Sequence, residues 1–254
     1  MLKLATDKDL DCILSFCDGD LLGTRIGCYC LAYGFERDFL NVWVNHTASG
    51  INAVIAKFYD SITIKADCED LSEIREFVSM LGFTTLETSE STCLKLSYKS
   101  DEIKKSYIFN GTAENMEAQE LSEEYFKALY QLVCENIPGS FGDDKESYLA
   151  FLSDFTFRKR RGLARSKGII LDGKLVSSVI TSAEVPGNAL ISAVASDKTV
   201  RGTGIGRKTV LTMLSELQSE GKNIYVIALN ESAEGFYEHL GFEFKENITI
   251  IRGR

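Results

Sequence analysis

The feature that most constrains the fold is a strand, a glycine-rich turn, a helix and a second strand in succession between residues 189 and 229. Ala189–Ala195 reads as a strand, and Arg201–Gly206 supplies the turn. The next helix has its apolar face at Val210, Leu211, Leu214 and Leu217, and Gly221 marks its end. Residues 224–229 are continuously apolar, as in a strand buried on both faces. This order predicts a parallel strand pair joined by a right-handed crossover.

The turn has the properties of an anion site. Glycines at 202, 204 and 206 permit unusual backbone dihedrals and close approach of a ligand. Exposed N–H groups at the start of the helix, together with the helix dipole, favour phosphate. Arg201, Arg207 and Lys208 add positive charge. We therefore expect a diphosphate ligand here.

Two other nucleotide motifs do not fit this turn. A dinucleotide fingerprint that starts at Gly202 needs a third glycine at position 207, which is Arg207. A P-loop needs Gly-Lys-Ser/Thr, whereas the chain has Gly206-Arg207-Lys208-Thr209.

The C-terminal half alternates helices and strands. Helical spacing covers Leu121–Cys134 and Ser147–Phe157, with a break at Asn136–Ser140. Asp172-Gly173 predicts a hairpin turn, and Pro186-Gly187-Asn188 predicts a second turn. A short helix at Ser232–Leu240 and a strand at Phe242–Ile251 complete this half. We predict an α/β fold with a central mixed sheet flanked by helices.

The N-terminal half contains a weak echo of the second. Phe77–Phe83 resembles Phe236–Phe242, and both segments end in Leu-Gly-Phe. Strand patterns at Ile51–Ile55 and Ser61–Ala66 and a helical pattern at Asp9–Phe16 fit a duplicated fold. The alternative is that glycine commonly caps a helix before an apolar residue. We predict two tandem domains, at residues 1–105 and 115–254.

Composition narrows the class of protein. The net charge is −9 and the pI about 4.9, which disfavours nucleic-acid binding. The basic run Arg158–Arg161 precedes Gly162 and is typical of a helix C-terminus. The seven cysteines form no C-x-x-C pair, and with two histidines they supply a metal site poorly. No apolar run is long enough to span a bilayer, and Met1–Asp11 lacks the apolar core of a signal peptide. We expect a cytoplasmic protein with reduced thiols, without nucleic-acid or membrane partners and without a metal.

Two motifs resemble the GNAT superfamily of N-acetyltransferases. Arg201, Gly204 and Gly206 meet its pattern Arg/Gln-x-x-Gly-x-Gly/Ala, and Val194–Asp197 resembles its preceding strand end. Lys198 replaces the usual proline. Downstream, Asn230, Ala233, Tyr237, Gly241 and Phe242 match the second signature. The resemblance covers roughly residues 118–254 and is specific because motifs, order and spacing agree.

This resemblance implies acetyl-coenzyme A as cofactor and a role for each residue. The backbone N–H groups of Gly202, Thr203, Gly204, Ile205, Gly206 and Arg207 would hold the pyrophosphate. The main chain of Val194, Ala195 and Ser196 would pair with the pantetheine arm, and the Ser196 N–H would polarise the thioester carbonyl. Asn230 would bind the cofactor arm, and Tyr237 would protonate the departing thiolate. Taken alone, Tyr237 would read as a packing aromatic and Asn230 as a helix cap.

The general base is left open by the sequence. The strand Ala189–Ser196 carries no carboxylate, and Glu184 on the neighbouring strand is the nearest one. A water chain through Ser192 or Ser182 is the alternative. Glu135, Asp143 and Asp144 would suit a cationic acceptor, but acidic surface residues are common in this chain.

We expect transfer of an acetyl group to a primary amine of a small molecule or amino acid, by direct attack in a ternary complex. The alternatives are acetylation of a protein or peptide, and an acetyl-coenzyme A binding module without activity. No Arg-x-x-Gly-x-Gly occurs before residue 201, so we expect the first half not to bind the cofactor. It would wall the acceptor pocket or form a homodimer contact.

Overall fold

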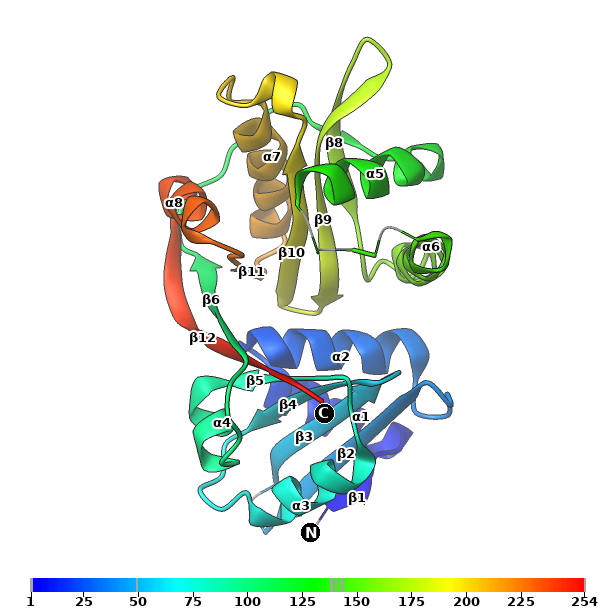
Figure 1. Ribbon diagram of the computed structural model, residues 1–254, viewed down its shortest axis with the longest axis vertical. Helices are drawn as coiled ribbons and strands as arrows, with labels where there is room; N and C mark the ends of the chain where they lie inside the picture. Colours follow the sequence, from blue (N-terminus) through cyan, green and yellow to red (C-terminus); the bar gives the residue numbers. More distant parts are fainter. Residues whose placement is uncertain (1, 49, 138, 140, 143, 254) are drawn as a thin grey trace. The chain divides into compact units, whose positions relative to one another are not determined.

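The computed structural model describes residues 2–48, 50–137, 139, 141–142 and 144–253. The chain divides into two compact units (Figure 1). The first unit consists of Met1–Tyr107, Ile227–Tyr237 and Glu243–Arg254, and the second of Ile108–Val226 and Glu238–Phe242. The division therefore does not follow a single cut of the chain, and the predicted domain bounds of 1–105 and 115–254 stay a prediction.

The elements follow one another as a repeated series. The first series is β1 (Leu2–Leu4), α1 (Leu10–Cys17), α2 (Leu21–Tyr33), β2 (Leu40–Thr47), β3 (Gly50–Phe58), β4 (Ser61–Ala66), α3 (Ser72–Leu81), β5 (Thr85–Ser89), α4 (Glu90–Lys95) and β6 (Glu102–Phe109). The second is β7 (Gln119–Glu120), α5 (Phe126–Asn136), α6 (Lys145–Lys159), β8 (Ser166–Leu171), β9 (Lys174–Val185), β10 (Asn188–Ser196), α7 (Ile205–Ser219), β11 (Asn223–Ile227), α8 (Glu231–Leu240) and β12 (Phe242–Arg252). Short 3-10 turns lie at Asp7–Asp9, Glu123–Tyr125 and Lys198–Val200.

The first unit is built on the strand order β1-β2-β3-β4-β5-β12-β6. Pairing is antiparallel from β1 to β4, parallel between β4 and β5, and antiparallel between β5 and β12. The strand that ends the second series thus extends the sheet of the first unit. Two apolar clusters stabilise this unit. One joins α3 to β3, β4 and β5, and the other joins α1 and α2 to β2 and β3.

The second unit is built on the order β11-β10-β9-β8-β7. β10 pairs with β11 in parallel, and α7 is the crossover between them, as predicted. α7 also contacts β8, β9 and β10, beside which it runs in Figure 1. Apolar residues of α5 and α6, including Phe126, Leu129 and Phe155, pack with Leu175, Ile180 and Ala195 of the sheet. The predicted fold class, a mixed sheet flanked by helices, is confirmed.

The repeated element order supports a duplication but corrects the alignment of the two halves. The echo of Phe77–Phe83 with Phe236–Phe242 pairs α3 with α8. By topology, α3 instead corresponds to α7, because each is the crossover between a parallel strand pair. The shared Leu-Gly-Phe reflects helix ends, with Gly82 at φ +62° and Gly241 at φ +98°. The counterpart of α8 is α4, which contains no tyrosine.

The hairpin turn predicted from Asp172-Gly173 in the second unit is confirmed. Asp172 and Gly173 have φ values of +48° and +79°, and Leu171 pairs with Lys174 across this two-residue turn. α6 ends at Lys159 within the basic run, and Gly162 follows at φ +71°. The seven cysteines are free thiols. Among the described residues, no helix has both the length and the apolar character needed to cross a membrane.

Candidate functional site

The strand before the glycine turn leaves its parallel partner part-way along its length. The ladder between β10 and β11 covers Asn188–Ile191, whereas β10 continues to Ser196. Its pairing with β9 shifts register between Ser192 and Ala195, and Ala193 lies there at φ +49°. A non-glycine residue with positive φ at such a bulge is a strained feature that often marks a functional site. The main chain of Val194–Ser196 therefore runs beyond the last pair with β11, as the resemblance requires for a pantetheine arm.

Asp197 fixes the exit from β10. Its carboxylate accepts hydrogen bonds from the Thr199 N–H at 2.9 Å and the Thr199 hydroxyl at 2.6 Å, and the Lys174 ammonium donates to its other oxygen. The Lys174 contact, followed by the bonds from Thr199, holds the pKa of this carboxyl well below its ordinary value. Lys198, which stands where the family usually has proline, begins a short 3-10 turn that Asp197 caps.

The glycine turn itself ends at the N-terminus of a long helix. Gly202 and Gly204 lie at φ +77° and +83°, and Gly204 is the N-cap of α7. The α7 dipole and its first-turn N–H groups create positive potential at this end. Arg207 and Lys208 are exposed in that first turn, and Arg201 donates to the Asn136 side chain at 3.0 Å. These groups suit a diphosphate in charge and in donor chemistry.

The second motif lies in α8. Asn230 accepts from the Ala233 N–H through its side chain and from the Glu234 N–H through its carbonyl, each at 3.0 Å. Asn230 therefore caps α8, as its alternative reading predicted. Tyr237 is 6% exposed, and burial raises the pKa of its phenol above the ordinary value, so the phenol is protonated at neutral pH. His239, also in α8, is exposed.

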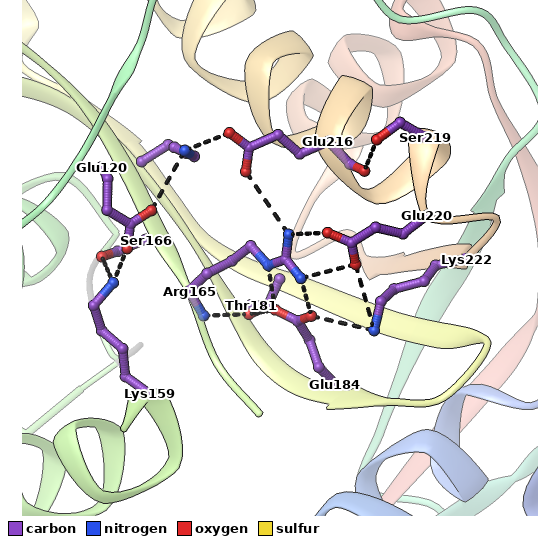
Figure 2. Close-up of polar contacts among 11 residues, drawn as sticks. Glu120, Lys159, Arg165, Ser166, Thr181, Glu184, Glu216, Ser219, Glu220 and Lys222 are labelled. Atoms are coloured by element: carbon purple, nitrogen blue, oxygen red, sulfur yellow. Dashed lines mark hydrogen bonds and ion pairs between the residues drawn. The ribbon is translucent and has the colours of Figure 1, made fainter. Parts of the chain in front are cut away.

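Glu184 is buried in an ion-pair cluster rather than exposed at a turn. It is 1% exposed and binds the Arg165 guanidinium at two points, at 2.8 and 2.7 Å (Figure 2). Thr181 donates to it at 2.6 Å, and the Lys222 ammonium lies at 3.4 Å. Glu184 pairs with Ala189 at the start of β10, whereas Ser196 ends that strand. At about 3.3 Å per residue, the two lie roughly 20 Å apart along the strand.

These contacts favour a structural role for Glu184. Both carboxylate oxygens are already engaged by Arg165, Thr181 and Lys222, and the residue is almost fully buried, so little of the carboxylate is accessible to an acceptor amine. The catalytic role predicted for Glu184 stays a prediction.

The structure also brings in residues that sequence reasoning missed. Lys174 holds Asp197, Asn136 holds Arg201, and Ser177 lies against Ser196. Each partner is distant in sequence and belongs to a different element, so no local pattern announces it. Only the bond between Asp197 and Thr199 could have been found from the sequence, because an aspartate commonly caps a short turn by accepting from the residue two positions later.

Comparison with known proteins places this domain in a family. In this unit a bulged strand leads into a glycine turn and a crossover helix. Residues 126–242 match the acetyltransferase (GNAT) family, and this part of the chain is a GNAT acetyltransferase domain. A search of curated protein sequences finds no match to the chain.

Solved structures of similar fold span nearly the whole chain. A tandem GNAT protein from the clavulanic acid biosynthesis pathway has a TM-score of 0.63 and 13% identity, over 98% of this chain and 97% of that one. A GNAT-family acetyltransferase from Colwellia psychrerythraea has a TM-score of 0.61 and 15% identity, with both chains covered in full. A GCN5-related N-acetyltransferase from Sphaerobacter thermophilus has a TM-score of 0.60 and 13% identity, over 98% and 94%. At these identities the likeness shows the fold.

Proposed function

We propose that this protein transfers an acetyl group from acetyl-coenzyme A to a primary amine of a small molecule or amino acid. The observation that carries the proposal is the turn at Arg201–Gly206. Its positive φ values, its helix N-terminus and its cations suit the diphosphate of coenzyme A. The GNAT match over residues 126–242 supports the acetyl chemistry.

Each residue in this proposal has a defined task. Bound acetyl-coenzyme A supplies the acetyl group as a thioester. The N–H groups from Gly202 to Arg207 bind the pyrophosphate, and the main chain of Val194–Ser196 aligns the pantetheine arm. The Ser196 N–H polarises the acetyl carbonyl. Tyr237 donates its phenol proton to the thiolate sulfur as the amine attacks the acetyl carbonyl.

The route by which the ammonium loses its proton is the remaining step. The contacts that occupy both oxygens of the buried Glu184 favour a water path along Ser182 or Ser192 over direct transfer to that carboxylate. Of the three carboxylates that would suit a cationic acceptor, the structure describes Glu135 and Asp144, whereas Asp143 lies outside the described residues. Asp144 caps α6 by accepting from the Ser147 N–H and hydroxyl, which favours a structural role for it.

Three further properties of the protein stay proposals or predictions. The linker between β4 and α3, Asp67–Leu71, carries three acidic residues and no glycine, so we propose that the first half binds no coenzyme A. A homodimer contact and a cytoplasmic location stay predictions.

The direct test is thiol release from acetyl-coenzyme A with a panel of amino acids, polyamines and peptide N-termini. We expect turnover with at least one small amine. Turnover with peptides alone would support the protein-acetylating alternative. Cofactor binding without turnover on any amine would support a binding module.

A matched pair of glycine variants tests the loop. We expect Gly204→Glu to abolish measurable coenzyme A binding in calorimetry. Gly173→Glu is its control, because Gly173 has nearly the same φ, +79° against +83°, and both positions have open space around them. Equal cofactor affinity in the two variants would refute the loop assignment. A stoichiometry of two cofactors per chain would overturn the claim about the first half.

A further inference from the structure

Three hydroxyl groups form a continuous chain behind the glycine turn. The Thr209 hydroxyl, in the second turn of α7, donates to the Ser177 hydroxyl of β9 at 2.8 Å. The Ser177 and Ser196 hydroxyls lie 3.1 Å apart. Thr209 and Ser177 are 0% and 1% exposed. Three elements that frame the turn, β9, β10 and α7, thus meet through these hydroxyl groups.

Two of these hydroxyl groups also contact main-chain carbonyl oxygens, one on each side of the turn. Ser177 lies 3.2 Å from the carbonyl oxygen of Ala195, which precedes the turn. Thr209 lies 3.0 Å from the carbonyl oxygen of Ile205, which follows it. The hydroxyls therefore connect the residue before Ser196 to the first residue of α7. The segment 197–204 lies between these two residues, so both of its ends are held by the hydroxyl groups.

Ser196 is the member of this series of hydroxyl groups that lies against the glycine turn. A Cβ built on Gly206 would lie 2.8 Å from the Ser196 Oγ atom, closer than real contacts allow. The Ser196 side chain therefore occupies the space that any side chain at position 206 would need. Because Gly206 has no side chain, there is room for the Ser196 hydroxyl beside it.

Burial makes this arrangement rigid. A buried hydroxyl without a hydrogen bond is destabilising, so Thr209 and Ser177, which are both buried, are held to their neighbours. Loss of the Thr209 hydroxyl takes one partner from Ser177, whose remaining contacts with Ser196 and the Ala195 carbonyl can then shift. The effect of a change at Thr209 is thereby carried to Ser196 and Gly206.

We propose that Ser177 and Thr209 are positioning residues, which hold both ends of the glycine turn in the geometry that binds a diphosphate. The proposal rests on the proposed function of this turn. Neither residue contacts the ligand in this scheme. They act through Ser196 and through the carbonyl groups of Ala195 and Ile205.

The test compares Thr209→Val, Thr209→Ser and Ser177→Ala with the control Thr212→Val. Thr212 lies on the same helix, is 1% exposed and donates to the carbonyl of Lys208 at 3.0 Å. Its hydroxyl also accepts from the N–H groups of Met116 and Ala118, so it serves a different segment. Its replacement therefore matches the cost of a buried Thr→Val change without touching the hydroxyl chain.

Two readouts are measured on the full chain. The first is amide hydrogen exchange of the segment 196–207 without ligand. We expect severalfold faster exchange in Thr209→Val and Ser177→Ala than in Thr212→Val or Thr209→Ser. The second is calorimetric affinity for coenzyme A. We expect a roughly five- to tenfold weaker Kd in the first two variants, little change in the other two, and kcat at saturating cofactor within about twofold of wild type.

The outcomes separate the two claims. If Thr209→Val and Thr212→Val give equal exchange and equal affinity, the positioning role is overturned. If wild type does not bind coenzyme A, the proposed function fails and takes the ligand-binding part of this inference with it. Exchange in the absence of ligand then still reports whether the hydroxyls hold the turn. A Thr209→Ser variant that behaves like Thr209→Val would also count against the hydroxyl as the active group.

Discussion

The guanidinium of Arg165 and the carboxylate of Glu184 form a two-point ion pair inside the second unit. Nε lies 2.8 Å from Oε1, and Nη2 lies 2.7 Å from Oε2 (Figure 2). Arg165 also donates to Glu220, the C-cap residue of α7, at 2.7 and 3.0 Å. One cation thus links β9 to the C-terminal end of the crossover helix.

Arg165→Met should destabilise the protein strongly. The variant leaves the Glu184 carboxylate buried, with Lys222 as its remaining cation. Breaking a buried pair from one side costs about 3–5 kcal/mol. Glu220→Gln is the control, because Glu220 is 42% exposed and an exposed pair contributes roughly 0–1 kcal/mol. Urea unfolding of both variants measures the difference, and equal losses would contradict a buried, structural pair.

Glu184→Gln separates a structural carboxylate from a general base. We expect a lower free energy of unfolding and a kcat within about threefold of wild type, since both carboxylate oxygens are already occupied by Arg165, Thr181 and Lys222. Loss of a general base would lower kcat about a hundredfold or more. Steady-state kinetics over pH 6–9 on the folded variant decides between them, and a large loss of kcat at unchanged stability would restore the catalytic role.

Gly206→Ala should weaken coenzyme A binding without unfolding the chain. The new Cβ would meet the Ser196 hydroxyl at 2.8 Å, so that side chain must move. Alanine otherwise favours the helix by roughly 1 kcal/mol over glycine. We therefore expect a roughly tenfold weaker Kd together with little change in unfolding temperature. Unchanged affinity would show that the Ser196–Gly206 contact does not shape the site.

Asp9 should make the first unit sensitive to acid. The Lys3 ammonium hydrogen-bonds this carboxyl, and together with bonds from Thr6 it lowers the pKa of Asp9 from 3.8 to about 2. Because the folded pKa is lower than the unfolded one, the stabilisation is complete above pH 3.8 and is lost as the pH falls toward about 2. The difference in unfolding free energy between wild type and Asp9→Asn should shrink across that window. A constant difference from pH 6 to pH 2 would contradict this assignment.

Tyr237→Phe should lower kcat about a hundredfold and leave the Kd for acetyl-coenzyme A unchanged. Burial raises the pKa of the Tyr237 phenol above its ordinary value, so in wild type its ionisation should not limit kcat up to about pH 10. Tyr98→Phe is the control. Burial also raises the pKa of that tyrosine, and its buried hydroxyl has no hydrogen-bond partner among the described residues. A full kcat in Tyr237→Phe would remove the proposed acid.

Much of the second unit was predictable because its signals are local. The turn at Asp172-Gly173 needs two positive φ values, and the parallel pair follows from the strand–helix–strand order. In the first half, the same kind of local signal misled. Leu-Gly-Phe caps both α3 and α8, although the two helices hold different places in the repeated series. A cap is set by a few neighbouring residues and carries no information about topology.

The sequence by itself determined the glycine turn, its positive charge and the order of the elements around it. These depend on residue type and on spacing along the chain. The tertiary structure decided the state of Glu184, which Arg165 and Lys222 neutralise from other elements, and the contact of Ser196 with Gly206. It also decided that β12 completes the sheet of the first unit. Burial and ion pairing depend on which distant residues meet, because the free energy of a polar group is set by its surroundings and not by its neighbours in sequence.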